Sequence, residues 1–561
     1  MVDRFLKLVT KGYTSVTEAA IVLGIFSLVS QLLGLVRDRS LASLLGPSQA
    51  LDIYYTAFRV PDFLFISVAS LASITVLLPF LASKMQEENG EHKTRVFFSH
   101  VFSAFLFLLV GLSAVLFLLM GKLAPMLAPG FDAEALRQLV SVSRILLLSP
   151  ILLGLSNMLG SITQLHHKFF VYALSPVFYN LGIIFGIVVL FPRYGINGIA
   201  VGVILGAVMH MAIQLPTIIT HRFLPRITFN VKWRDIKDIV MLSLPRTLGL
   251  SLSSLTTLVL ISFMSKLSTG SISIFNFAYN LQTVPVGIIG ISYAVASFPT
   301  LVKSYVQDKA VYIDHIITAS RAILFWSIPF AVVFIVFRAH IVRIVLGAGA
   351  FSWNDTKLTA AALGLFAVGV ISQNLVHLFV RAYYAEGNTR LPLLINTGTA
   401  IVTIIGALGL RSLYEHAPAF AHGLTTLLRV PDIIGGAVLV FPIAFALGSI
   451  VNALILFILF CGKIPQALRL PYYRSILQSF FAAIVAGVFA YGALGVFAPV
   501  ANQDTFSGIF LQAFIAGIVY IVTWIVAQEL LGNREYHGIK QMLLKKIWKT
   551  EVIVPEHEEL T

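Results

Sequence analysis

The chain has 561 residues, of which 58% are hydrophobic and only 11% are charged, and its formal net charge is +14. A soluble protein of this composition would have too little polar surface to cover its core, so a soluble globular fold is excluded. The single cysteine excludes a disulfide framework and a cysteine metal site. The basic residues fall mostly in short loops between apolar segments, where they indicate membrane orientation and not a nucleic-acid partner.

Long apolar segments follow one another along almost the whole chain. A helix needs about 20 apolar residues to cross a bilayer, so the sequence predicts an all-α polytopic membrane protein with about 14 transmembrane helices. We expect these helices at residues 15–42, 51–83, 95–120, 136–164, 169–191, 196–219, 238–265, 271–303, 313–339, 356–384, 390–411, 434–461, 472–497 and 506–532.

Basic residues concentrate in the loops on one side of the predicted membrane. The largest cluster lies within residues 220–237, and the C-terminal tail is also basic. The positive-inside rule places this side in the cytoplasm. We therefore expect both termini in the cytoplasm, because an even number of crossings returns the chain to the side on which it began.

Two short stretches of sequence recur at similar offsets. Residues 57–60 (AFRV) resemble residues 278–281 (AYNL), and residues 176–180 (PVFYN) resemble residues 392–396 (PLLIN). These matches predict two six-helix lobes of parallel topology, an arrangement in which transporters hold substrate between the repeats. The expected parts are an N-lobe at 1–219, a basic cytoplasmic linker at 220–237, a C-lobe at 238–461, two further helices at 462–532 and a cytoplasmic tail at 533–561.

The first two predicted helices carry many polar side chains for membrane segments. Gln31 and Asp38 share one face of the first helix, with Arg37 beside them. Asp52 and Arg59 lie on the second helix at helical spacing. A guanidinium fork matches the geometry of phosphate oxygens, so the arginines predict a binding site for a phosphate or diphosphate.

Arg144 and Arg246 each lie about two turns inside a predicted helix, and we expect them at the same anion site. An arginine at the bilayer centre costs at least about 2.5 kcal/mol, so such residues face a partner or a water-filled cavity. In the alternative interpretation, the nearby acids Asp38, Asp52 and Asp62 only neutralise the arginines of the first two helices. Arg39 is expected to reach the membrane interface.

Several other kinds of site are disfavoured. The helices between residues 238 and 461 carry no carboxylate at mid-membrane depth, which argues against a proton or sodium site there. No phosphate-binding loop of a nucleotide hydrolase is present. No loop gathers the acids and histidines that a metal-dependent enzyme would need. The sequence thus predicts a transporter without a cofactor or metal, not an enzyme.

Residues 30–38 (SQLLGLVRD) resemble the first-helix signature of the MurJ (MviN) family of bacterial lipid II flippases. Residues 51–61 (LDIYYTAFRVP) resemble its second-helix signature. Supporting similarities occur at residues 128–131 (APGF) and 383–392 (YYAEGNTRLP). The resemblance implies the fold of the multidrug/oligosaccharidyl-lipid/polysaccharide exporter superfamily.

The resemblance also implies a function in peptidoglycan biosynthesis. A member would move the undecaprenyl-diphosphate-linked precursor, lipid II, across the bacterial cytoplasmic membrane by alternating access. Its surroundings would be membrane lipids, and cell-wall synthesis proteins are possible partners. By position in the motifs, Arg37, Asp52, Arg59 and Arg144 would line the central cavity.

Three positions depart from the family pattern. Gln31, Phe65 and Asn280 stand where the family usually has arginine. We nevertheless expect Gln31 and Asn280 to line the cavity. Because of these departures, an alternative function remains: a flippase for another polyprenyl-linked oligosaccharide, such as an O-antigen or capsule unit. A drug/cation antiporter of the same superfamily and a non-transporting scaffold are further alternatives.

Overall fold

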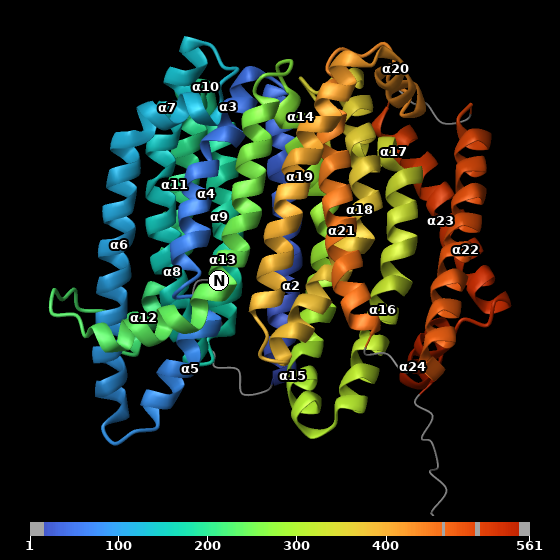
Figure 1. Ribbon diagram of the computed structural model, residues 1–561. Coiled ribbons are helices and arrows are strands. Elements are labelled where there is room, and N and C mark those ends of the chain that lie inside the picture. Colours follow the sequence, from blue (N-terminus) through green and yellow to red (C-terminus); the bar gives the residue numbers. More distant parts are fainter. Residues whose placement is uncertain (1–15, 463–465, 500–504, 549–561) are drawn as a thin grey trace, which may run out of the picture. The chain divides into compact units, whose positions relative to one another are not determined.

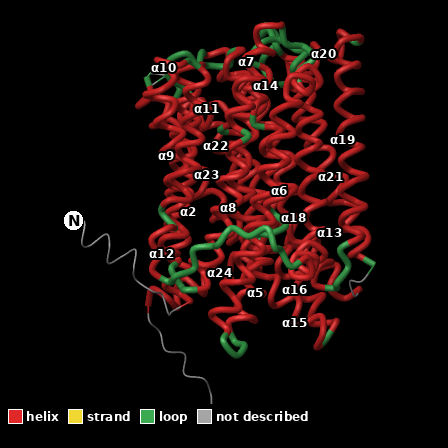
Figure 2. Tube along the Cα trace, turned by 90° about the vertical axis from the view of Figure 1, so that its left-hand side faces the viewer, coloured by secondary structure: helices red, strands yellow, loops and turns green. Residues whose placement is uncertain are grey.

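Helices make up the computed structural model of the chain, which describes residues 16–462, 466–499 and 505–548 (Figure 1). No strand occurs among these residues. They contain thirteen helical spans that are long and apolar enough to cross a bilayer. Helix dominates the trace throughout, with short loops between the helices (Figure 2). The predicted all-α polytopic fold is therefore confirmed.

The second predicted helix, at residues 51–83, is interrupted, so the prediction of one continuous helix was wrong. It consists of α3 (Gln49–Ala57), α4 (Arg59–Leu64), a π-helical segment (Phe65–Ala69) and α5 (Ile74–Met85). Pro61 lies four residues after Ala57 and has no N–H to donate to the Ala57 carbonyl, which explains the first break. Together with the thirteen continuous spans, this segment agrees with the predicted count of about fourteen.

One compact unit comprises the chain up to Leu281, with Ile341–Phe366 and Asn388–Asn452. Its other helices are α2 (Val16–Leu45), α6 (Gly90–Leu127), α7 (Ala133–Leu146), α8 (Leu148–Leu165), α9 (Phe169–Phe185), α10 (Phe191–Tyr194), α11 (Ile196–Ala212), α12 (Leu215–Thr220), α13 (Trp233–Met264), α19 (Arg390–His416) and α20 (Pro418–Leu427). Four helices have one part in each unit, namely α14 (Ser271–Pro285), α17 (Arg338–Leu346), α18 (Trp353–Ala385) and α21 (Val440–Cys461).

Helices α9 and α11 lie side by side because glycines face each other along them (Figure 1). A Cβ on Gly202 would meet the backbone of Gly186, and a Cβ on Gly182 would meet the backbone of Gly206. Small residues at a spacing of four let the backbones of two membrane helices approach closely. The pair forms a rigid support for the helix that carries Arg37.

That helix, α2, packs on α9. Phe170, Val171, Leu174 and Val177 form a buried cluster on α9, and the α2 side chains packed against it are Val22, Phe26, Val29 and Leu33. These α2 residues recur at spacings of three and four and form one apolar stripe. The stripe fixes the rotation of α2 and hence the direction in which its polar residues point.

The predicted linker, residues 220–237, is shorter in the structure because α13 begins at Trp233. The connection follows α6: the backbone N–H of Arg226 donates to Ser99 Oγ at 3.1 Å, and that of Thr228 donates to Ser103 Oγ at 3.0 Å. Figure 2 draws it as the green segment between α12 and α13. The predicted division into two six-helix lobes stays a prediction.

The second unit comprises Gln282–His340, Ala367–Gly387 and the chain from Ala453 onward. Its other elements are α15 (Ser292–Gln307), α16 (Lys309–Val336), α22 (Gln466–Phe497), α23 (Phe506–Leu530) and α24 (Arg534–Trp548). Helix α22 packs against both α16 and α23. Helix α24 lies in the predicted tail and is held at its start by an ion pair between Arg321 and Glu535, whose side chains are 11% and 12% exposed.

Candidate functional site

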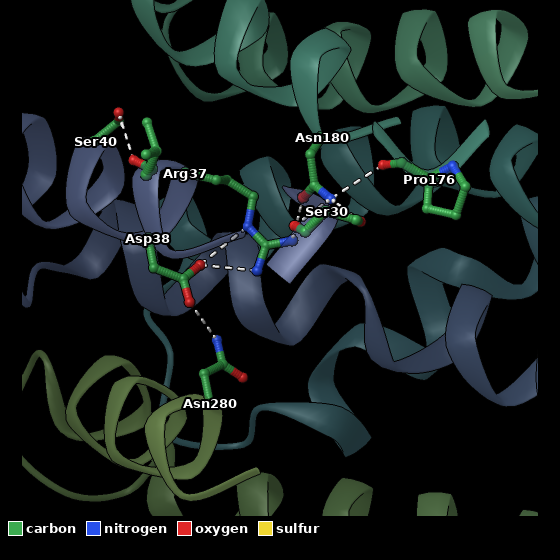
Figure 3. Close-up of polar contacts among 8 residues, drawn as sticks. Ser30, Arg37, Asp38, Ser40, Pro176, Asn180 and Asn280 are labelled. Carbon is green, nitrogen blue, oxygen red and sulfur yellow. Dashed lines mark hydrogen bonds and ion pairs between the residues drawn. The ribbon is translucent and has the colours of Figure 1, made fainter. Parts of the chain in front are cut away.

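Arg37 lies at the centre of a polar network near the end of α2 (Figure 3). Its guanidinium pairs with Asp38, with Nε and Nη2 at 3.0 and 2.9 Å from Oδ1. Arg37 Nη1 donates to Asn180 Oδ1 on α9 at 3.3 Å. Asn280 Nδ2 on α14 donates to the other carboxylate oxygen of Asp38 at 3.0 Å. Two helices distant in sequence therefore converge on the Arg37–Asp38 pair.

The two charges of this pair differ in exposure. The side chain of Asp38 is 6% exposed, while that of Arg37 keeps 25% of its surface accessible. Asp38 is satisfied within the protein, because both of its oxygens accept hydrogen bonds. Arg37 is oriented by its partners, and about a quarter of its side-chain surface remains accessible.

One face of α14 supplies the partners of three charged residues from α2, α3 and α4. Ser273, Asn276 and Asn280 follow one another at spacings of three and four, so they share that face. We call this contact the polar seam; it consists of Asp38, Asp52 and Arg59 on one side and Gly270, Ser273, Asn276 and Asn280 on the other. The seam joins α2, α3 and α4 to the first part of α14.

Asp52 anchors the seam at the start of α14. One carboxylate oxygen accepts from the backbone N–H of Gly270 at 2.7 Å. The other accepts from the N–H and the hydroxyl of Ser273 at 2.8 and 2.6 Å. The first N–H groups of a helix have no partner within it, and a carboxylate there also matches the helix dipole. Both oxygens of Asp52 are engaged in these bonds, so the geometry does not support its predicted role in substrate binding, which stays a prediction.

Arg59 is less completely satisfied than Arg37. Its Nη2 donates to Asn276 Oδ1, while its buried Nε has no hydrogen-bond partner in the described part of the chain. Asp62, one turn further along α4, is exposed and forms no ion pair with Arg59. A buried donor without a partner is costly, and an anionic ligand is one way to satisfy it.

In the alternative interpretation, the acids of the first two predicted helices only neutralise nearby arginines. This interpretation holds for Arg37 and Asp38. Asp38 does pair with Arg37, whereas Asp52 binds backbone and hydroxyl groups of α14. Arg39 Nη1 donates to the carbonyls of Ile344 and Val345 at 2.8 and 3.2 Å. Those carbonyls end α17, where a cation also stabilises the helix dipole.

The predicted polar face of α2 is open beside the network. Gln31 is exposed, and a Cβ on Gly24 or Gly34 would meet no atom within 4 Å. The face therefore borders free space instead of a packed neighbour. Arg246 lies on α13, but its side chain is outside the described part of the structure, so its predicted place at the site stays a prediction.

Arg144 lies apart from this network. Its Nε donates to the Phe117 carbonyl on α6 at 3.1 Å, and its guanidinium lies 4.7 Å from the centre of the Phe117 ring. The buried residues of α7, which include Leu139, Val142 and Leu146, lie on the opposite face of the helix. The structure thus brings Arg37 together with Asn280, and Arg59 with the same face of α14, but it does not bring Arg144 to them.

Sequence reasoning missed three residues of the site: Asn180, Ser273 and Asn276. Asn180 was recognised only as part of a repeated stretch. The spacing of Ser273, Asn276 and Asn280 was a usable signal, because polar residues at three and four on a membrane helix mark a polar face. Among the residues described, no group of three histidine, cysteine or acidic side chains is placed to hold a metal ion.

Residues 41–516 match the family model described as "Lipid II flippase MurJ". The chain belongs to the MurJ lipid II flippase family. A relative from Haemophilus influenzae, named probable lipid II flippase MurJ, is 26% identical over 91% of this chain and 99% of its own length. The lipid II flippase MurJ of Burkholderia cenocepacia is 25% identical over 72% of this chain and 79% of its own length.

Solved structures agree on the fold of this MurJ family member. A lipid II flippase MurJ in an inward closed conformation has a TM-score of 0.70 at 22% identity, over 91% of this chain and 99% of the other. An inward-facing multidrug resistance MATE transporter of the MOP superfamily has a TM-score of 0.62 at 17% identity, over 79% and 98%. The fold implied by the helix signatures is confirmed, and MurJ membership agrees with the prediction of a transporter, not an enzyme.

Proposed function

We propose that this MurJ family member translocates lipid II across the bacterial cytoplasmic membrane by alternating access. Family membership supports this proposal, because the relatives carry the name lipid II flippase. The observation that carries it is the state of Arg59, whose buried Nε lacks a partner beside a polar network centred on a partly exposed arginine. Gln31 and Asn280 complete this set of residues at the proposed site.

The diphosphate of the substrate matches the chemistry of Arg37 and Arg59. Hydrogen bonds from a guanidinium to a phosphate oxygen are short, and two parallel bonds can form to one phosphate. Nε of Arg59 is available for such a bond, and Arg37 is held in place by Asp38 and Asn180. Asp38 already pairs with Arg37, whereas Arg59 is a membrane-embedded cation with a buried donor that has no partner among the described residues, which favours capture of an anionic group.

The polar seam gives a route from binding to conformational change. Arg59 belongs both to the proposed substrate site and to the seam, through its bond to Asn276. A diphosphate that takes over the Arg59 guanidinium weakens that bond and so lowers the cost of opening the seam. A ligand shifts a conformational equilibrium only through such differential contacts. Opening would expose the head group on the far side while the lipid tail stays in the bilayer.

The orientation of the chain is also a proposal. The basic connection between α12 and α13 and the basic C-terminal region support a cytoplasmic location for both termini. The seam end of α14 then faces the outside. Impermeant thiol labelling of single cysteines placed in the loop before α14 and in the loop before α13 tests this arrangement. The former is expected to react from outside and the latter from inside.

Complementation tests the function. A bacterial host depleted of its own lipid II flippase would express this chain, and lipid II exposed on the outer leaflet would be measured. We expect exposure to be restored by the wild type and reduced at least tenfold by Arg59→Gln or Arg37→Gln. The control Arg411→Gln removes an arginine from an exposed i,i+4 pair with Glu415 and is expected to retain transport.

Two outcomes would contradict the proposal. Transport by Arg59→Gln and Arg37→Gln at the wild-type rate would show that the arginines do not capture the diphosphate. In the second outcome, a membrane-inserted wild-type chain fails to restore lipid II exposure and yet transports another polyprenyl-linked glycan. That result would show that lipid II is not the substrate. Wild-type levels of each variant in the membrane must accompany both measurements.

A further inference from the structure

A pocket of about 460 Å³ lies between α6 and α7, away from the polar seam. Phe117 from α6 and Val140, Ser141, Arg144 and Leu148 are among its lining residues. Neither the proposed transport site nor the seam uses any of these side chains. The charged residues of the lining are Arg137 and Arg144, and both are cationic.

The pocket opens on the lipid-facing side of the helices. Around Phe117, the apolar residues Val115 and Leu118 are 51% and 76% exposed on α6, and Leu148 is 51% exposed at the start of α8. Helix α6 belongs to a span long and apolar enough to cross the membrane. Large apolar side chains exposed on such a span face acyl chains in a bilayer.

Part of the Arg144 guanidinium donates no hydrogen bond to the described residues. Its Nε is bound to the Phe117 carbonyl, while Nη1 and Nη2 have no hydrogen-bond partner among the described residues. The lining of the pocket holds no carboxylate. The nearest acid on α7, Glu134, pairs with Arg137 one turn further on. Arg144 is therefore a cation on the lipid-facing side that has no anionic partner among the described residues.

The depth of Arg144 suits the head group of a lipid. It lies two helical turns beyond Arg137, or about 10 Å along the axis. Asp132, Glu134 and Arg137 are exposed and polar, which places the start of α7 at the membrane interface. An arginine at this depth reaches the head-group region with its side chain, where lipid phosphates provide the missing negative charge.

We propose that the α6–α7 pocket binds an anionic phospholipid. The phosphodiester accepts hydrogen bonds from Arg144 Nη1 and Nη2, and Ser141 lies within the same pocket. One acyl chain follows the apolar wall formed by Phe117 and Leu148. The site binds structural lipid on the flank of the protein and is separate from the substrate site at Arg37 and Arg59.

Lipid titration of the purified full-length protein tests this inference. Native mass spectrometry would count bound lipids during titration with phosphatidylglycerol, phosphatidylethanolamine or inorganic phosphate. Loss of the charge-assisted bonds is expected to weaken phosphatidylglycerol binding at least about tenfold in Arg144→Gln. Val140→Trp, which fills the pocket and keeps the charge, is expected to weaken binding similarly. Arg193→Gln removes an exposed arginine on α10 and is expected to bind as the wild type does.

Each remaining outcome would overturn the inference. Phosphatidylglycerol and phosphatidylethanolamine share the phosphodiester and differ in net charge, so equal binding of the two would show that the pocket does not select an anionic lipid. Competition by inorganic phosphate at the same concentration would show that the site takes a free anion and not a lipid. Unchanged binding in both Arg144→Gln and Val140→Trp, or equal loss in Arg193→Gln, would show that bound lipid lies elsewhere. Arg144→Lys, which keeps the charge, distinguishes a folding defect from a lost contact, because it is expected to retain partial binding.

Discussion

Replacing Asp52 with asparagine is expected to weaken the polar seam without removing any volume from it. The carboxylate accepts three hydrogen bonds from the start of α14, at 2.6 to 2.8 Å. An amide has only one acceptor oxygen, and its NH2 group would face a donor on Gly270 or Ser273. At least one of the three bonds is therefore lost, and the charge at the helix terminus disappears.

The magnitude follows from the kind of bond. A hydrogen bond to a charged group contributes about 1.5–3 kcal/mol. At about 1.4 kcal/mol per factor of ten, this loss shifts the equilibrium between the closed and the open seam by roughly 10- to 150-fold. The change acts on the closed state, because Asp52 meets α14 only when the seam is formed.

Thiol accessibility measures the shift. In a Cys461→Ser background, Thr56→Cys places a reporter on α3 at a position that is 0% exposed with the seam closed. The rate of reaction with a membrane-impermeant maleimide reports how often the seam opens. We expect Asp52→Asn to raise this rate by roughly 10- to 150-fold, in proportion to the open population.

Asp308 provides a matched control. Its Oδ1 accepts from the Ala310 N–H at 2.7 Å and caps α16, but it takes no part in the seam. Asp308→Asn is expected to leave the labelling rate of the Thr56→Cys reporter unchanged. If Asp52→Asn also labels at the wild-type rate while the protein elutes and melts as a folded species, the assignment of Asp52 as the anchor of the seam is wrong.

Three further predictions concern the support of the site and the ends of the spans. Gly202→Leu forces α11 away from Gly186, the residue directly after α9, and is expected to lower the melting temperature by several degrees. Burial and charge repulsion from His221, whose ring centre lies 3.9 Å away, lower the pKa of His166 to about 4. The contribution of the neutral His166 ring to stability is therefore fully present above pH 6.5 and is lost as the pH falls toward 4, and His166→Phe is expected to flatten this fall in a melting series. Glu535→Gln breaks the nearly buried pair with Arg321 and is expected to expose α24 to protease.

Each of these changes has a control in the chain. Gly121→Leu introduces the same side chain where a Cβ would meet no atom within 4 Å, and its melting temperature is expected to match the wild type. His167→Asn removes an exposed neighbouring histidine at a positive φ of 56° and is expected to keep the pH dependence. Glu529→Gln breaks an exposed pair with Lys540 and is expected to leave α24 protected. A control that behaves like its test variant would contradict the corresponding reasoning.

The sequence by itself determined the membrane fold, because transfer of a helix into a bilayer depends on a local run of apolar residues. Thirteen spans follow from hydropathy, whereas the interruption of the second predicted helix became visible only in the structure. The signature residues Arg37 and Arg59 were found for a related reason, since a charge in a membrane helix is too costly to be placed by chance. The family followed from those short motifs.

Only the tertiary structure decided what each charge contacts. Asp38 and Asp52 are both acids of the first two predicted helices, which also carry arginines. In the structure Asp38 pairs with Arg37, whereas Asp52 caps α14, which begins more than two hundred residues later in the chain. Arg144 could face either side of α7 until the packing of that helix was known. Hydropathy reports how deep a residue lies but not which neighbour it meets, because contacts between membrane helices depend on rotation and packing that no local stretch of sequence encodes.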